Sequence, residues 1–222
     1  MKKKMTPYLL LVPQLLLGVI FIIGLLTGII QSLGVIPAFG LTEPTLDYYK
    51  EVLTRPDTLQ SLKYSLYIAF VSAFFATVVG VFFCAVLVWK NKTKGGIMRV
   101  VQIPIIVPHV VVALFAINIL SRNGILARIC VALGWIADQQ QFPMLIYDTN
   151  GIGVILAYLW KEIPFVIYFV IALMASINGS LGEAAVNLGA SRMKAFMKVT
   201  LPLCMNTILS GFLIVFVFAL GA

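Results

Sequence analysis

The sequence predicts an all-α protein, a polytopic bundle of helices that crosses a membrane several times. Of its 222 residues, 61% are hydrophobic and only 11% are charged, whereas soluble domains hold about 45–50% apolar and about 25% charged residues. The charges also divide the chain into long uncharged runs. Because a bilayer core holds no water to satisfy backbone polar groups, apolar runs of about 20 residues must be helical there.

Five of these runs are long enough to cross a hydrocarbon core about 30 Å thick at about 1.5 Å per residue. The last run reaches Ala222 with no polar residue closing it, so we expect a bundle truncated before its last helix. The expected spanning helices cover residues 8–30, 64–89, 100–120, 153–177 and 203–222.

Lysine and arginine predict the orientation, because loops on the cytoplasmic side of a membrane carry an excess of these residues. The N-terminus, residues 90–99 and residues 178–202 together hold ten basic residues, and the two intervening loops hold five. Six of the eight acidic residues also lie in those intervening loops. We therefore expect the N-terminus in the cytoplasm, and we attribute the net charge of +8 to topology and not to a nucleic-acid partner.

A long polar segment separates the first helix from the other four. We divide the chain accordingly into residues 1–63, with the first helix and an external loop, and residues 64–222, the core transmembrane domain. The external loop, residues 31–63, contains three prolines and predicts a short surface helix over residues 47–53. This loop either contacts an external partner or is a solvated connector.

The loop of residues 178–202 has the features of folded structure. Ser180 and Glu183 have the S-x-x-E spacing of a capping box, which predicts a short helix starting near Leu181. Gly189 can end that helix with a positive φ. The loop is therefore expected to contain a helix followed by a bend.

A second short helix is expected after the bend. Ser191 can cap it, it runs toward Leu201, and Pro202 marks the turn into the next spanning helix. One face of this helix is apolar and another is basic, which a simple connector would not need. We infer a docking surface for a cytoplasmic partner, bound by a helix-in-groove mode, and an amphipathic helix lying on membrane lipid remains the alternative. The two faces consist of Met193, Phe196 and Met197, and of Lys194 and Lys198.

The same loop resembles the cytoplasmic EAA loop of permease subunits of binding-protein-dependent ABC importers with the type I fold. The family pattern is E-A-A, three residues, Gly, nine residues, then I-x-L-P. This chain has Glu183-Ala184-Ala185, then Gly189, then Val199-Thr200-Leu201-Pro202, and Val for Ile is its only departure from the pattern. The resemblance covers most of the chain from about residue 60, including the stretch Trp160-Lys-Glu-Ile-Pro-Phe165.

The resemblance implies a role for the loop in transport. Residues 183–188 would form a coupling helix that sits in a groove of a separate ATPase subunit, and Gly189 would allow the sharp bend. ATP would be bound by that subunit alone, since this chain has no G-x-x-x-x-G-K-[ST] motif and is expected to bind no cofactor and to be no enzyme. The implied ATPase-coupling residues are Glu183, Ala184, Ala185, Gly189, Ala190, Leu201 and Pro202.

The implied setting is a bacterial inner membrane. The partners would be ABC ATPase subunits, a second permease subunit that is identical or homologous, and an extracytoplasmic solute-binding protein. The solute would be small and polar, from the branch that handles polyamines, iron, sulfate, molybdate or phosphonates. A membrane scaffold or assembly protein whose loop binds a partner other than an ATPase is the alternative from another class.

Lys161 and Glu162 interrupt the fourth apolar run. A charge at a helix centre costs about 2.5–3.5 kcal/mol on insertion scales and usually faces a bundle interior or a watery path. The pair either lines a translocation pathway, or lies at the outer interface with the helix starting near Ile163, and the second interpretation is favoured. No Cys/His cluster predicts a metal site.

Two prolines, Pro104 and Pro108, lie about one turn apart in the expected third span, with His109 next to the second. Each removes a helix hydrogen bond and introduces a kink. The kinks are either hinges of a pathway or fixed packing features. His109 is a candidate proton or substrate ligand in the pathway, although no partner for it is visible in the sequence.

Overall fold

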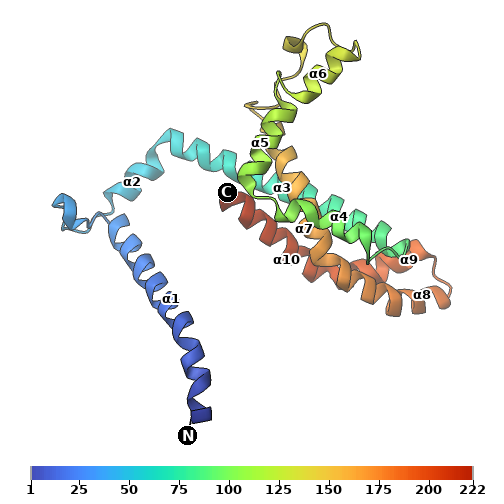
Figure 1. The fold of residues 1–222 in the computed structure, drawn as a ribbon, viewed down its shortest axis with the longest axis horizontal. Helices are drawn as coiled ribbons and strands as arrows, with labels where there is room; N and C mark the ends of the chain where they lie inside the picture. The colour runs from blue at the N-terminus through green and yellow to red at the C-terminus, as the bar shows by residue number, and fades with distance from the viewer. Residues whose placement is uncertain (1, 222) are drawn as a thin grey trace. The chain divides into compact units, whose positions relative to one another are not determined.

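The computed structural model describes residues 2–221, and the side chains of residues 10–221. The described residues form helices and turns, with one isolated bridge between Ile36 and Leu41 and no strand (Figure 1). The all-α prediction is confirmed. The chain divides into two compact units, Met1–Lys63 and Tyr64–Ala222.

Five helical segments of the described chain are long and apolar enough to cross a membrane. Their number agrees with the sequence prediction, and four of the five overlap the expected spans closely. The third is shifted toward the C-terminus, for a reason given below. The segments are Leu10–Ser32, Pro56–Trp89, His109–Ala132, Ile152–Asn187 and Arg192–Gly221.

Helix α7 (Ile152–Ile177) is the central element of the unit Tyr64–Ala222. It packs against α4 (Gly96–Ile106), α5 (His109–Leu120) and α10 (Leu201–Gly221) (Figure 1). Its buried side chains recur three and four residues apart, so they form one stripe of a helix facing the core. These side chains include Val166, Ile167, Val170, Ile171 and Met174.

Helix α3 (Pro56–Trp89) presents mostly small side chains to the core. At Gly80 a Cβ atom would lie 2.8 Å from Cγ1 of Val166, closer than real Cβ atoms come. Without a hydrophobic force between helices in lipid, small residues that allow close backbone approach are what bring helices together. The buried small residues of α3 include Ala69, Ser72, Ala73, Ala76, Gly80, Cys84 and Ala85.

The third expected span is not one helix, so the prediction of a helix over residues 100–120 is wrong. Helix α4 ends at Ile106, Val107 and Pro108 are extended with ψ of 127° and 146°, and α5 begins at His109. Pro108 has no N–H to donate, and its ring disfavours the helical conformation at the residue before it. Of the two prolines at which kinks were expected, only Pro108 interrupts the helix. Pro104 stays inside α4, whereas Pro108 ends it.

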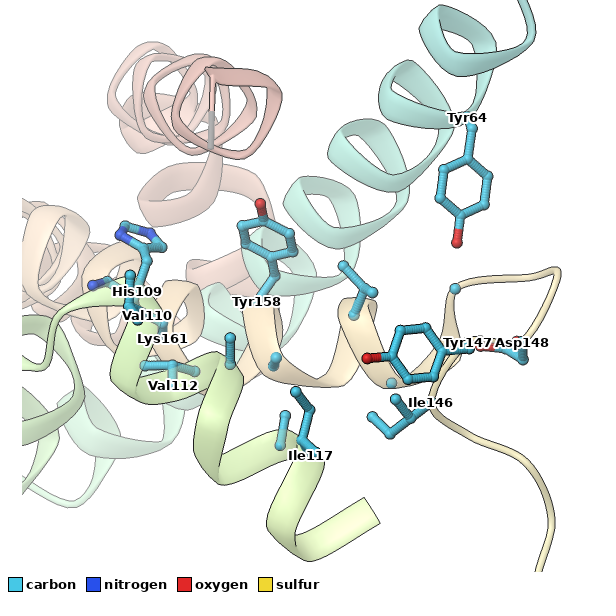
Figure 2. A pocket seen from close by; sticks show the side chains of 16 residues that line it. Tyr64, His109, Val110, Val112, Ile117, Ile146, Tyr147, Asp148, Tyr158 and Lys161 are labelled. Carbon is cyan, nitrogen blue, oxygen red and sulfur yellow. The ribbon is translucent and has the colours of Figure 1, made fainter. Parts of the chain in front are cut away.

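The segment after the break is continued by two further short helices. They are α6 (Ile125–Ala132) and the 3-10 helix η2 (Gln139–Gln141). Figure 2 shows the start of α5, at His109, next to Lys161 and Tyr158 of α7.

Helix α7 begins ten residues before Glu162, so the interpretation that this helix starts near Ile163 is wrong. The carboxylate of Asp148 accepts hydrogen bonds from the N–H of Asn150 at 3.1 Å and of Ile152 at 2.9 Å. It thereby satisfies donors that a helix start leaves free. Lys161 and Glu162 consequently lie within a continuous helix.

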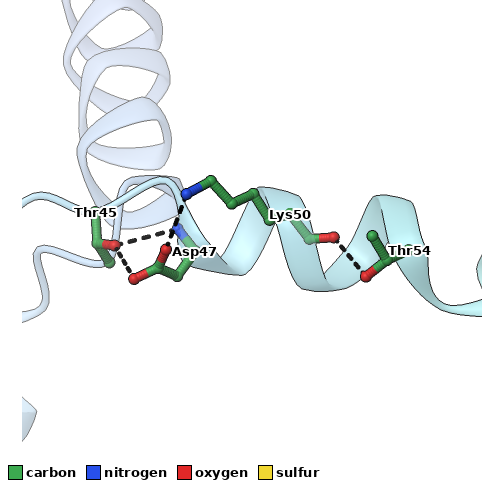
Figure 3. Close-up of polar contacts among 4 residues, drawn as sticks. All are labelled: Thr45, Asp47, Lys50 and Thr54. Carbon is green, nitrogen blue, oxygen red and sulfur yellow. Dashed lines mark hydrogen bonds and ion pairs between the residues drawn. The ribbon is translucent and has the colours of Figure 1, made fainter.

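The unit Met1–Lys63 contains α1 (Lys2–Ser32), the 3-10 helix η1 (Pro37–Phe39) and α2 (Asp47–Thr54). The short helix expected over residues 47–53 is confirmed by α2. The N–H of Asp47 donates to Oγ1 of Thr45 at 3.1 Å, and that hydroxyl donates to the Asp47 carboxylate at 2.8 Å (Figure 3). A hydrogen bond of 2.6 Å from Tyr49 Oη to Ser32 Oγ ties α2 to the end of α1.

Candidate functional site

The loop of residues 178–202 is built from the ends of two long helices. After α7 the chain continues through a π-helical turn, η3 (Asn178–Gly182), into α8 (Glu183–Asn187). The capping box at Ser180 is therefore wrong, because no helix starts there. The Ser180 hydroxyl instead donates to the carbonyl of Ser176 at 3.0 Å, one turn earlier in the same helix.

The bend after α8 is the one expected at Gly189. Its φ is +92°, and nothing lies within 4 Å of the position that a Cβ would take. The N–H of Gly189 donates to the carbonyl of Val186, and the N–H of Ala190 donates to that of Ala185. These two bonds form a Schellman motif, which satisfies the free carbonyls at a helix end and needs a left-handed residue. The prediction of a positive φ at Gly189 is confirmed.

The side chains at the bend point away from the protein. Leu188 is 90% exposed, and Glu183, Ala184 and Gly189 are exposed as well. Ala185 and Ala190 are half-buried. A leucine this exposed, at a bend whose backbone groups are already satisfied, is free to enter a partner's groove without unfolding the loop.

The second half of the loop begins as expected and ends differently. Ser191 caps α9 (Arg192–Ala195) by accepting a hydrogen bond from the N–H of Lys194 at 3.3 Å, which confirms its predicted role. The chain then passes through a second π-helical turn, η4 (Phe196–Thr200), straight into α10. The turn expected at Pro202 is wrong, since Leu201 and Pro202 are the first residues of α10, which continues from η4 without a break.

The three residues of the apolar face expected on this second helix do not share one environment. Phe196 is buried, with its ring 5.3 Å from that of Trp89 in an edge-to-face arrangement. Met193 and Met197 remain exposed, at 56% and 52%. The three residues have the spacing of one helix face, but the π-helical turn changes the angle between successive residues, so Phe196 faces the core.

The two π-helical turns pack against each other behind the bend, a feature that the sequence gives no signal for. Gly182 lies between them: a Cβ there would be 3.1 Å from Asn178 Oδ1 and 3.4 Å from Thr200 Oγ1. The Thr200 hydroxyl is buried without a hydrogen-bond partner. Single π-helical turns often occur at functional sites, and here they connect each membrane helix to the exposed bend.

The loop and the end of α3 enclose a polar hollow of about 320 Å³. Because the residues that follow α3 line it, the structure brings the basic segment of residues 90–99 and the loop to the same end of this unit. Asn91, which has a left-handed φ of 55°, lies at that junction. The polar residues lining the hollow are Asn91, Asn178, Glu183, Asn187 and Arg192.

Two of the three other candidate residues lie around a separate cavity of about 560 Å³ between α5, α7 and the start of α3. His109 and Lys161 both line it, together with Tyr158, Tyr64 and Asp148 (Figure 2). The imidazole of His109 lies 6.5 Å from the Tyr158 ring, centre to centre. The sequence showed no partner for His109, and in the structure its nearest aromatic neighbour across the cavity comes from α7.

Glu162 does not line this cavity. Its side chain is 5% exposed and lies near Ser72 of α3, and its Oε2 has no hydrogen-bond partner. Lys161, one residue away, points in a different direction, where its Nζ donates to the carbonyl of Val107 at 2.5 Å. The two charged residues therefore belong to different surroundings, as the turn of about 100° per helical residue requires.

Residues 2–221 contain no group of three or more His, Cys, Asp or Glu side chains able to hold a metal ion. The described arrangement thus offers an exposed helical bend at one end of the bundle and a largely apolar cavity within it.

The chain belongs to the family of binding-protein-dependent transport system inner membrane components, whose family model matches residues 76–222. This is a family of membrane transport components and not of enzymes, and the resemblance found in the sequence is confirmed. As an inner membrane component with several apolar helices of membrane length, the chain is a multi-pass membrane protein.

Two relatives show how similar individual members are. The sulfate transport system permease protein CysT of Escherichia coli (strain K12) is 29% identical over 175 residues, which are 78% of this chain and 59% of CysT. The putrescine transport system permease protein PotI of the same strain is 27% identical over 175 residues, which are 78% of this chain and 57% of PotI. The chain thus spans somewhat less than two thirds of the length of these curated relatives.

A solved structure has the same fold. It is a bacterial ABC transporter involved in the import of the acidic polysaccharide alginate, with a TM-score of 0.76 and 20% sequence identity, covering 100% of this chain and 75% of that one. At this identity the likeness concerns the fold alone, and it confirms the all-α membrane architecture.

Proposed function

We propose that this chain is the permease subunit of an ATP-binding-cassette importer, and that it forms part of the translocation pathway for a small polar solute. Membership of the transport family supports this proposal, as do the five helices of membrane length. The cavity lined by His109 and Lys161 would belong to the pathway. Glu162, which faces α3, would instead act in helix packing.

The observation that carries the proposal is the exposed bend after α8. The proposed ATPase contacts are Glu183, Ala184 and Ala185, followed by Leu188, Gly189 and Ala190. A short helix followed by a tight turn suits a groove in a partner protein. Because α7 and α10 continue through π-helical turns into the short helices beside this bend, a pull on it would move both membrane helices together. Leu201 and Pro202, at the start of α10, would transmit that motion and make no contact of their own.

Several partners follow from this proposal. The ATPase subunits would bind and hydrolyse ATP, so this chain needs no cofactor. A second permease subunit, identical or homologous, would complete the pathway, and an extracytoplasmic solute-binding protein would deliver the solute. A relative's structure was solved as an alginate ABC transporter in complex with a periplasmic protein bound to an alginate pentasaccharide. The bend would face the cytoplasm, as would the N-terminus.

For the solute, we propose the branch that handles sulfate, polyamines and similar small charged compounds. The relatives named as sulfate and putrescine permeases support this choice. The family also includes a relative named as an sn-glycerol-3-phosphate permease, 26% identical over 203 residues. Sulfate is an anion and putrescine is a cation, so measuring the uptake of each distinguishes an anion permease from a cation permease.

The test replaces Leu188 with aspartate in the full permease. Because Leu188 is 90% exposed, L188D should fold normally, and a lost apolar anchor should weaken ATPase binding by about tenfold or more. The matched control is L133D, an exposed leucine (57%) in the turn after α6, at the other end of α7 from the bend. Copurification of the ATPase and uptake of radiolabelled sulfate and putrescine into proteoliposomes are measured for both variants.

We expect L188D to lose the ATPase and ATP-driven uptake, and L133D to retain both. If L188D kept full ATPase binding and uptake, the coupling role of the bend would be wrong. If the loop captured a partner that is not an ATPase, the scaffold alternative would replace the proposal.

A further inference from the structure

The break between α4 and α5 leaves polar backbone groups in apolar surroundings. Val107 and Pro108 are extended, so the carbonyl of Val107 has no place in a helical ladder. Apolar segments flank the break on both sides. Where no water is available, such a group must find a partner elsewhere in the protein.

Lys161 supplies that partner. Its Nζ lies 2.5 Å from the carbonyl oxygen of Val107, 54 residues earlier in the chain, and the side chain is half-buried. A hydrogen bond from a charged donor is stronger than a neutral one. The same side chain lines the cavity of about 560 Å³ (Figure 2). One lysine therefore both closes the break and forms part of the cavity wall.

The neighbouring turn of α7 makes a different contact. Tyr158 lies three residues before Lys161, and its Oη donates to the carbonyl of Ala219 in α10 at 3.4 Å. Thus α7 holds α10 through one side chain and the start of α5 through another. The first amides of α5 depend on the break as well, because Val111 and Val112 both donate to the carbonyl of Pro108.

We propose that Lys161 is a positioning residue that clamps the start of α5 against α7 and so fixes the shape of the cavity between them. The side chain does this from within the helix, and Glu162 plays no part, since it faces α3. This inference rests on the proposed function only in giving the cavity a place in the transport pathway. In the transport cycle, release of this hydrogen bond would loosen the start of α5 at the break without unfolding either half-helix.

The test is hydrogen–deuterium exchange of the first turn of α5, measured on the full permease in lipid nanodiscs. K161M removes the donor and keeps most of the volume, so the amides of Val111 and Val112 should exchange at least about tenfold faster. K161R retains a charged donor and should exchange like the wild type. Y158F is the matched control, because it removes the contact to α10 and should leave these amides unchanged.

A second pair of variants keeps the test decisive should K161M fold poorly. P108A restores an amide at the break and permits a continuous helix, so in this background K161M should no longer raise exchange. If K161M exchanged like the wild type, or if its effect were equal in the P108A background, the clamp would be wrong. Exchange is measured without ATP or solute, so this result is independent of whether sulfate or putrescine is transported.

Discussion

The membrane helices are interrupted at Pro108 and at Gly189, and the backbone carbonyls that each interruption leaves free are satisfied in opposite ways. At Pro108 the helix breaks within apolar surroundings, and the carbonyl of Val107 depends on a lysine from another helix. At Gly189 the helix ends in a Schellman motif, whose two bonds satisfy the free carbonyls locally. The first interruption is held by the bundle, and the second needs nothing from it.

The difference teaches where each interruption can act. A break that depends on a distant donor is coupled to the cavity that this donor lines, so it suits an internal gate. A bend that satisfies itself can leave its side chains exposed, as Leu188 is at 90%, so it suits docking. The residue type decides this in each case: proline favours the extended backbone that leaves the Val107 carbonyl without a helical partner, whereas glycine permits the left-handed turn that closes the helix end.

The largest expected contrast is in chemical accessibility. A cysteine at Leu188 should react completely with a membrane-impermeant maleimide added from the cytoplasmic side, and a cysteine at His109 should not react from that side. The experiment uses a C130A background, because the other two cysteines, Cys84 and Cys204, are buried. Labelling of L188C from the outside only would overturn the predicted orientation and the coupling proposal with it.

The next contrast concerns the two prolines. P108A should allow α4 and α5 to join as one helix, which redirects α5 and reshapes the cavity, so we expect the uptake rate to fall by about tenfold or more. P104A is the control, since Pro104 already lies within α4 and its replacement leaves the break in place. Equal uptake by P108A and the wild type would mean that the break is a packing feature with no part in transport.

Much of the fold could be predicted because the membrane restricts it so strongly. Long uncharged runs have one solution in a bilayer, and so the helix class and the number of membrane-length segments followed from charge positions alone. The error at residues 100–120 came from treating Pro108 as a kink. The spacing of the prolines could not show that the carbonyl freed by a break would be served by Lys161, which is 54 residues away from Val107.

The candidate site was predictable where its geometry is local. Gly189 and Ser191 act through neighbours within a few residues, so sequence spacing identified both. Ser180 and Pro202 were misjudged because the flanking helices continue through π-helical turns, which pack against each other at Gly182 and Thr200 across a distance that sequence spacing does not reveal. The environment of Glu162 likewise depends on its packing against α3, and residue spacing within α7 cannot reveal that packing.

A smaller effect should distinguish the glycine with a positive φ in the loop, Gly189, from a glycine with an ordinary φ, Gly179. G189A places a Cβ on a residue with φ of +92°, a conformation that costs an L-residue about 1–2 kcal/mol. We expect ATPase binding to weaken by about tenfold, measured by titration of the ATPase onto the permease in nanodiscs. G179A is the matched control: Gly179 has an ordinary φ with nothing within 4 Å of its Cβ position, so binding should not change. Equal loss in both variants would show that the turn geometry is not what the partner needs.

The smallest effect concerns the packing behind the bend. T200V replaces a buried hydroxyl that has no hydrogen-bond partner with a methyl group of similar shape, so it should stabilise the protein by up to about 1–2 kcal/mol. T77V provides a comparison, because Thr77 on α3 is also buried without a partner and lies outside the loop. Both variants should raise the thermal unfolding midpoint in detergent. If the contact between the two π-helical turns needs the Thr200 hydroxyl when the bend moves, T200V will also lower the uptake rate and T77V will not. That result would show that the bend at Gly189 is coupled to the membrane helices that it is proposed to move.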